Sequence, residues 1–137
     1  MTFEPVLPDP IACPFCPIKH REILAEHPLA AAITDSFPLT QGHTLIVPRR
    51  HVASFFELTT NERLVMLGLL DQAKATLDAK YSPNGFNIGV NDGTAAGQTV
   101  MHVHIHLIPR YKGDADDPRG GVRWIFPRKA EYWNAKS

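Results

Sequence analysis

The spacing of hydrophobic and polar residues changes several times along the chain, and each change predicts a different element. Residues 29–35 form a brief apolar run that periodicity leaves open between strand and helix, and we predict a strand. Residues 43–47 are rich in β-branched side chains and predict a strand that Pro48 ends. Residues 86–90 alternate between apolar and polar side chains, and residues 99–108 form the last predicted strand.

One long helix is predicted over residues 60–80, where apolar residues recur at helical spacing. Thr59 and Glu62 fit a capping box, in which the hydroxyl caps the first turn and the carboxylate reaches back. Leu64 and Leu67 widen the apolar stripe beyond one face. The helix is therefore expected to be covered on more than one side, partly by a second subunit.

These elements predict a single α+β domain over residues 1–137, with an antiparallel sheet of about five strands and one main helix. The chain divides into a proline-rich arm at 1–28, a core at 29–110 and a charged, glycine-rich tail at 111–137. No internal repeat or linker separates these parts.

Composition narrows the function. The 14 Lys and Arg residues balance 14 Asp and Glu residues, so the formal net charge is zero and a partner such as duplex nucleic acid is not expected. No apolar run approaches the roughly 20 residues that span a bilayer, and the first residues do not form a secretory signal. We expect a soluble, cytoplasmic protein with no membrane partner.

The most distinctive pattern is residues 102–107, where histidine alternates with apolar residues. In a strand, His102, His104 and His106 would project from one face while Val103 and its apolar neighbours fill the core on the other. Such a row is compatible with chance surface histidines, with a catalytic metal on a His-x-His pair, or with imidazole acting as nucleophile and acid at phosphorus.

The loop at residues 91–100 favours phosphorus chemistry. It offers backbone amides, two glycines, an amide side chain and a hydroxyl, which are groups that hold phosphate oxygens without a large positive charge. Beside a histidine row, this loop indicates a phosphate-binding pocket.

Residues 97–100 and 102–108, Gly-Gln-Thr-Val followed by His-Val-His-Ile-His-Leu-Ile, resemble the signature of the histidine triad (HIT) nucleotide hydrolases. Residues 42–48, Gly-His-Thr-Leu-Ile-Val-Pro, resemble the other recurring segment of the family, and together the likeness covers roughly residues 30–110. The resemblance implies a HIT-like fold, a homodimer and a nucleotide substrate.

The resemblance also implies the catalytic roles. His104 would attack the α-phosphate and form a nucleotidyl-histidine that water hydrolyses, His106 would hydrogen-bond the phosphate or the leaving oxygen, and His43 would complete the pocket. Relatives similar to galactose-1-phosphate uridylyltransferase carry Gln where this chain has His106, so hydrolysis is favoured over transfer.

Substrate contacts follow from the same likeness. Asp35 would bind ribose, Asn91 would contact ribose or phosphate, and Gln98 and Thr99 would bind phosphate oxygens. The Pro-Arg pair at 109–110 places the chain nearest the dinucleoside polyphosphate hydrolases and their bacterial relatives, although phosphoanhydrides, phosphoramidates and adenylated small molecules all remain candidate substrates.

Two other functions are compatible with these residues. A zinc-dependent hydrolase would use His102 and His104 as catalytic ligands, and a nucleotide-binding interaction module would bind AMP with little turnover.

Cys13 and Cys16 have the CxxC spacing of a redox pair or of half a zinc site. Proline-rich surroundings disfavour the redox pair, and a closed zinc site would need two histidines that spacing alone does not select. The family resemblance implies a structural zinc on Cys13, Cys16, His51 and His102. The alternative is two reduced cysteines in an extended arm.

Residues 116–124 of the tail are compatible with two roles. They form either a solvated segment with one packed tryptophan, or a wall in which Arg119 or Arg123 approaches a polyphosphate and Trp124 stacks on a base.

Overall fold

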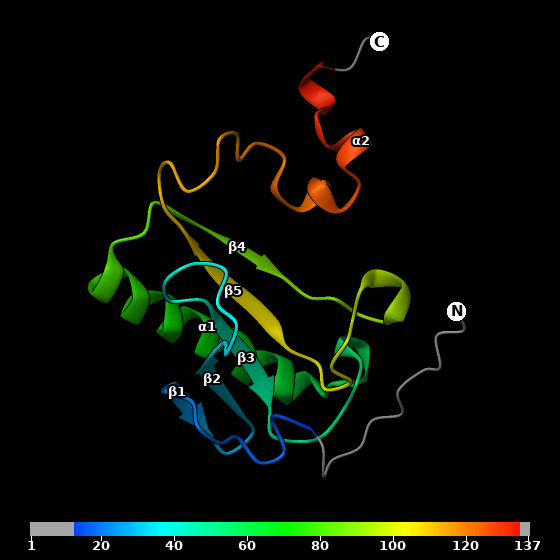
Figure 1. Cartoon of the computed structure of the whole chain (residues 1–137). Helices are drawn as coiled ribbons and strands as arrows, with labels where there is room; N and C mark the ends of the chain where they lie inside the picture. Colours follow the sequence, from blue (N-terminus) through cyan, green and yellow to red (C-terminus); the bar gives the residue numbers. More distant parts are fainter. Residues whose placement is uncertain (1–12, 135–137) are drawn as a thin grey trace.

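The computed structural model describes residues 13–134, and its centre is one antiparallel sheet with the strand order β1-β2-β3-β5-β4. The strands are β1 (Ile23–His27), β2 (Ala30–Thr34), β3 (Thr44–Pro48), β4 (Gly85–Gly89) and β5 (Ile105–Arg110). The helix α1 (Thr60–Tyr81) connects β3 to β4 (Figure 1). The predicted α+β class, with five strands and one main helix, is confirmed.

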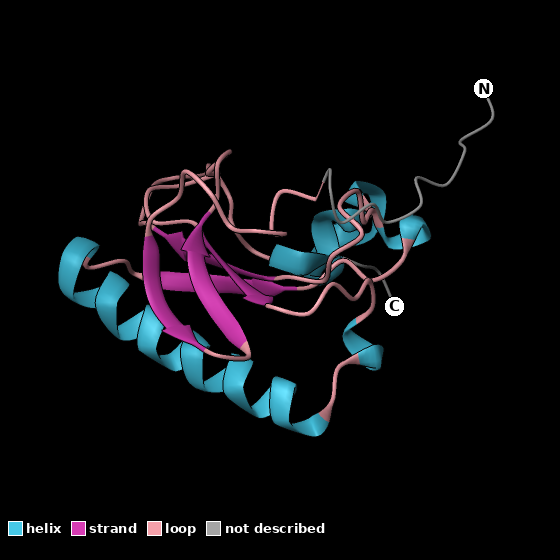
Figure 2. Ribbon diagram, turned by 90° about the horizontal axis from the view of Figure 1, so that it is seen from below, coloured by secondary structure: helices cyan, strands magenta, loops and turns pink. Residues whose placement is uncertain are grey.

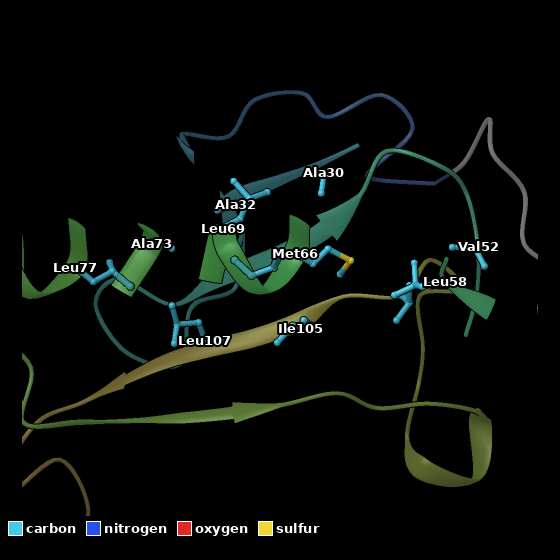
Figure 3. Close-up of a cluster of buried hydrophobic side chains, with 12 residues drawn as sticks. Ala30, Ala32, Val52, Leu58, Met66, Leu69, Ala73, Leu77, Ile105 and Leu107 are labelled. Carbon is cyan, nitrogen blue, oxygen red and sulfur yellow. The ribbon is translucent and has the colours of Figure 1, made fainter. Parts of the chain in front are cut away.

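The helix α1 covers one face of the sheet, and most connecting loops gather on the other side (Figure 2). Its buried apolar residues are Met66, Leu69, Ala73 and Leu77. Ala30 and Ala32 of β2 face them across the core (Figure 3). Because these side chains are small, the helix can approach the sheet closely. Leu64 and Leu67 of α1 stay 62% and 50% exposed in the single chain.

A second apolar cluster lies on the opposite face of β2 and β3. It joins Ala31, Ile33, Leu45 and Val47 to Phe15 of the N-terminal segment. Since both faces of these two strands are buried, their sequences read as continuous apolar runs rather than as alternating ones.

The predicted capping box is present at the start of α1. The Thr59 hydroxyl accepts a hydrogen bond from the Glu62 amide, and the Glu62 carboxylate accepts one from the Thr59 amide at 2.9 Å. Arg50 adds two hydrogen bonds to that carboxylate, of 2.8 and 3.2 Å. The Arg50 guanidinium and these backbone contacts lower the pKa of Glu62 to about 2, so the buried carboxylate stays ionised.

The strand predicted at 99–108 is wrong in its first half, because β5 begins only at Ile105 and continues to Arg110. Residues before Ile105 leave the sheet, and the Val103 amide donates instead to the Val52 carbonyl at 2.8 Å. Val103, Ile105 and Leu107 nevertheless all enter the core, as the alternation predicts. The sheet also starts earlier than expected, because Ile23–His27, within the predicted arm, pairs with β2.

The tail forms three short helical segments, η3 (Gly121–Ile125), α2 (Pro127–Ala130) and η4 (Tyr132–Asn134). They pack on one another beyond the β4 edge (Figure 1), and η3 contacts β4. Residues 1–12 of the predicted arm and 135–137 of the tail lie outside the described residues. None of the helices between residues 13 and 134 is long and apolar enough to cross a membrane.

Candidate functional site

The histidines of the triad and its surroundings fall into two groups. One group joins His102 to His51 and the two cysteines, and the other joins His106 to His43 and Asp35. His104 belongs to neither group, and its ring lies between them, with centroids 4.9 Å from His106 and 5.5 Å from Phe15.

Cys13, Cys16, His51 and His102 point their ligand atoms at one another. The His102 Nδ1 atom lies 3.5 Å from Cys13 Sγ, 3.3 Å from Cys16 Sγ and 3.1 Å from His51 Nδ1. In a tetrahedral zinc site with Zn–S of about 2.3 Å and Zn–N of about 2.0 Å, neighbouring ligand atoms are roughly 3.3–3.8 Å apart. The four side chains therefore fit a tetrahedral metal ion.

The protonation of His102 supports the same fit. Its Nε2 atom lies 2.8 Å from the Pro48 carbonyl oxygen, which only accepts, so Nε2 carries the proton and Nδ1 presents a lone pair to the group. A backbone carbonyl that holds the outer nitrogen of a ligating histidine is the usual support of a metal site. Burial lowers the pKa of His102, which keeps the ring neutral.

Cys16 does not have the lowered pKa of a reactive thiol. Burial, followed by the neighbouring Cys13, raises the pKa of Cys16 to about 11. Reactive CxxC cysteines instead have lowered pKa values. A bound metal ion would stabilise the Cys16 thiolate, which agrees with a metal site.

His43 and His106 form a hydrogen-bond chain. The Leu39 amide donates to His43 Nδ1 at 3.0 Å, so the His43 proton must reside on Nε2. That Nε2 lies 3.0 Å from His106 Nδ1 and 3.3 Å from an Asp35 carboxylate oxygen. His106 therefore accepts at Nδ1 and presents its own proton at Nε2.

This chain also disfavours a metal at the second group. Binding through His43 Nε2 would displace the only proton of that ring, because Nδ1 already accepts from Leu39. Burial lowers the pKa of His43 despite Asp35, and burial with the neighbouring His104 and His43 lowers the pKa of His106 to about 4. Both rings are neutral at neutral pH.

His104 presents a nitrogen lone pair that no described hydrogen bond occupies. Its Nδ1 atom lies 2.9 Å from the His102 carbonyl oxygen, so Nδ1 carries the proton and Nε2 holds a free lone pair. Phe15 packs edge-on against the rings of both His102 and His104. The aromatic residue between the two cysteines thus connects the cysteine and histidine group to His104.

Two side chains that belong to the loop at residues 91–100, those of Gln98 and Asp92, hold its backbone in place. The Gln98 side chain accepts from the Gly93 amide at 2.8 Å and donates to the Ala53 and Val100 carbonyls. The Asp92 carboxylate accepts from the Ser54 hydroxyl and from a neighbouring backbone amide. The Gln98 side chain is buried, and its amide group has no free donor for a phosphate oxygen.

Asn91 and Thr99 are exposed on the same loop. Asn91 and His106 both line an open cleft of about 960 Å³, which continues from the histidines along β4 to the tail.

The sequence matches the family model described as "HIT domain" over residues 18–113. The chain belongs to the HIT family. An uncharacterised HIT-like protein of Methanocaldococcus jannaschii is 40% identical over 112 residues, covering 76% of this chain and 83% of that protein. The bis(5'-nucleosyl)-tetraphosphatase (asymmetrical) of Schizosaccharomyces pombe is 38% identical over 86 residues, covering 63% of this chain and 47% of that protein. The AP-4-A phosphorylase of Mycobacterium tuberculosis is 34% identical, covering 69% and 49%.

Solved HIT structures share the fold. A HIT family protein of Bacillus anthracis superposes with a TM-score of 0.71 at 34% identity, covering 75% of this chain and 76% of that one. A zinc-bound histidine triad protein of Mycobacterium smegmatis also superposes with a TM-score of 0.71, at 30% identity, covering 80% and 82%. Both comparisons confirm the HIT-like fold predicted from the sequence.

Three contributors to the site escape the sequence patterns. The Leu39 amide and the Pro48 carbonyl act through the backbone, so no residue type signals them. Phe15 is visible only as the aromatic residue inside the CxxC spacing.

Proposed function

We propose that this protein hydrolyses a nucleotide phosphoanhydride or phosphoramidate through a nucleotidyl intermediate on His104. The observation that carries the proposal is the single tautomer of His104, whose Nδ1 donates to the His102 carbonyl and whose Nε2 is left with its lone pair. His106, its ring centroid 4.9 Å away, presents an Nε2 proton for a phosphoryl oxygen. A nucleophile and a hydrogen-bond donor are thus arranged side by side.

The reaction has two steps. His104 Nε2 forms a bond to the α-phosphorus, the bond from phosphorus to the leaving group breaks, and its electron pair departs with the leaving group, which takes a proton from solvent. Water then attacks the phosphorus, the P–N bond breaks with its electron pair returning to Nε2, and the proton from water is released. The products are the nucleoside monophosphate and the protonated leaving group.

The remaining substrate contacts are assigned by position. Asp35 binds ribose, and the exposed Asn91 and Thr99 bind ribose or phosphate oxygens. Gln98 contributes by holding the loop, since its amide is occupied by the backbone of Gly93 and Ala53.

The proposed metal is a structural zinc ion on Cys13, Cys16, His51 and His102. Its support is the convergence of four ligand atoms within 4.8 Å of one another, together with the zinc-bound state of the Mycobacterium smegmatis protein. When bound, zinc would hold the N-terminal segment against the start of β5. His102 is then withdrawn from chemistry.

Rapid quenching of the enzyme with an adenosine-labelled substrate tests the mechanism. The label is expected on His104, and His104→Ala should lower kcat at least about a thousandfold, since loss of a nucleophile removes the covalent route. His27→Ala, on the exposed β1 edge, is the matched control and should retain activity. Normal turnover by His104→Ala, or a label found on no histidine during turnover, would refute the proposal.

Chelation, AMP binding and the His104→Ala variant separate this mechanism from the two alternative functions. A catalytic metal on His102 and His104 would be lost to a strong chelator at once, whereas the nucleophilic mechanism retains its initial turnover. In the structure the His102 ring points toward Cys13 and Cys16, and His104 does not belong to that group. A binding module would bind AMP normally and be indifferent to His104→Ala.

We also propose a homodimer, because Leu64 and Leu67 remain exposed on the apolar helix. Sedimentation at micromolar concentration should give twice the mass of the chain. A purely monomeric species would contradict it.

A further inference from the structure

The loop between β2 and β3 supplies the amide that fixes the proton of His43. The Leu39 amide donates to His43 Nδ1 at 3.0 Å, yet the side chains of Phe37 and Leu39 are 86% and 74% exposed. Burial of these side chains therefore does not hold the amide in place. Its position depends on the polar contacts that the loop makes farther along, at residues 40–43.

Thr40 connects the loop to the strand that carries His106. The loop, cyan in Figure 1, lies beside β5, and the Thr40 hydroxyl donates to the Pro109 carbonyl of that strand at 2.5 Å. The Thr40 carbonyl accepts from the His43 amide at 3.2 Å. Since Thr40 directly follows Leu39, its link to β5 limits how far the Leu39 amide can move from the His43 ring.

Tyr111 gives the loop a second anchor. Its hydroxyl, just after the end of β5, donates to the Gln41 carbonyl at 2.7 Å. The next residue, Gly42, has a φ of 91° and packs on α1, where a Cβ would lie 3.0 Å from Leu77 and 3.1 Å from Tyr81. The turn is thus held between β5 and the C-terminal end of α1, and only glycine suits this backbone angle and this close approach.

The groups that face His43 act in opposite directions on its charge. Burial lowers the pKa of His43, Asp35 at 3.3 Å from Nε2 raises it, and His104 lowers it. His106 accepts the Nε2 proton at 3.0 Å. The Leu39 amide acts with burial, because it bonds the neutral form and a second proton on Nδ1 would face its N–H group. Asp35 alone would leave Nδ1 open to that second proton.

We infer that Thr40 and Tyr111 are positioning residues for His43. They hold the turn at residues 39–42 so that the Leu39 amide stays on Nδ1, the ring stays neutral and its one proton points at His106. Both act through the backbone, since their hydroxyl groups bond carbonyl oxygens that flank the turn.

Side-chain ¹⁵N NMR of the histidines tests this inference in the protein without substrate. The His43 signals are those missing from His43→Asn, and in the wild type they should show a neutral ring protonated on Nε2. Thr40→Val removes the hydroxyl at nearly constant shape. At a mildly acidic pH where both proteins are folded, the protonated fraction of His43 should be at least about threefold higher in the variant. Tyr111→Phe should change it in the same direction, and an unchanged fraction in both variants would overturn the inference.

Two further variants separate the Thr40 hydroxyl from general effects of substitution. Thr40→Ser keeps the donor to Pro109 and should restore the wild-type fraction. Thr76→Val removes a comparable hydrogen bond, from an exposed threonine hydroxyl of α1 to the Gln72 carbonyl, and should leave His43 unchanged. A change at His43 as large with Thr76→Val as with Thr40→Val would contradict a specific role of the turn.

Steady-state kinetics then connects the turn to turnover, and this step rests on the proposed function. His43 holds His106 through the 3.0 Å hydrogen bond, so Thr40→Val should lower kcat about 3-fold to 10-fold with KM little changed. Thr40→Ser should recover kcat, and a change in KM alone would contradict positioning. Failure of the proposed function is distinguishable, because it would appear as normal turnover by His104→Ala while the NMR difference at His43 persisted.

Discussion

His43, His102 and His104 are each fixed in one tautomer by a backbone group, and the tautomer decides which ring nitrogen offers a proton and which a lone pair. The Pro48 carbonyl leaves His102 with a lone pair facing the cysteines, and the His102 carbonyl leaves His104 with a lone pair at Nε2. The Leu39 amide sets the direction of the chain from His43 to His106. In the proposed mechanism, identical side chains thus serve as a metal ligand, a nucleophile and a hydrogen-bond donor.

His106 should make the stability of the fold depend on pH. Its pKa is lowered to about 4 in the folded chain, mainly by burial, against 6.5 for an ordinary imidazole. Between these values only the unfolded chain gains the proton, so the free energy of unfolding falls as the pH drops from 6.5 to about 4, by at most about 3 kcal/mol. Urea denaturation at neutral and acidic pH should show a smaller loss for His106→Asn than for the wild type. An equal loss would contradict the assignment.

Phe15 should position the nucleophile. Phe15→Leu keeps an apolar side chain in the second cluster but removes the ring that contacts His102 and His104. We expect kcat to fall between about 3-fold and 30-fold with little change in KM, since small displacements of a reacting group are costly. Steady-state kinetics measures both constants, and Ile18→Leu, in the same cluster, is the control. A rise in KM with kcat unchanged would point to a role in substrate binding instead.

At the scale of elements, the helix α1 is specified locally whereas β5 is not. The capping box and the apolar spacing of α1 lie within the helix and its first turn, so the sequence predicts its start correctly. The alternation from residue 102 onward predicts which side chains enter the core, but not where the strand begins. His102 leaves the sheet because its ring joins residues 51 to 89 positions away in the chain.

The N-cap of α1 offers a direct measurement. Thr59→Ala removes the hydroxyl that accepts from the Glu62 amide, and the free energy of unfolding should fall by about 1 kcal/mol. Thr59→Ser keeps the acceptor and should be nearly neutral. Chemical denaturation of the three proteins is sufficient. Equal stability of the Ala variant and the wild type would show that the cap contributes nothing.

At the scale of the whole molecule, the proposed zinc ion joins the N-terminal segment, the end of β3 and the start of β5. Chelation should lower the thermal midpoint by at least about 5 °C, because a structural metal binds the folded chain only. The variant Cys13→Ser/Cys16→Ser should show the lowered midpoint without chelator and no further change with it. Elemental analysis should find one zinc ion per wild-type chain. A wild type free of zinc and unaffected by chelator would contradict the proposal.

The sequence by itself determined the elements whose signals are local: the capped helix, the short apolar strands and the core face of Val103, Ile105 and Leu107. Its motifs also predicted the family and assigned candidate roles to the site residues through their likeness to the HIT family. Only the tertiary structure decided the tautomer of His102, because it depends on the Pro48 carbonyl in another segment of the chain. It likewise turned Gln98 inward and placed the tail beside the histidines. Periodicity reports the geometry within one segment, whereas a site depends on how distant segments pack.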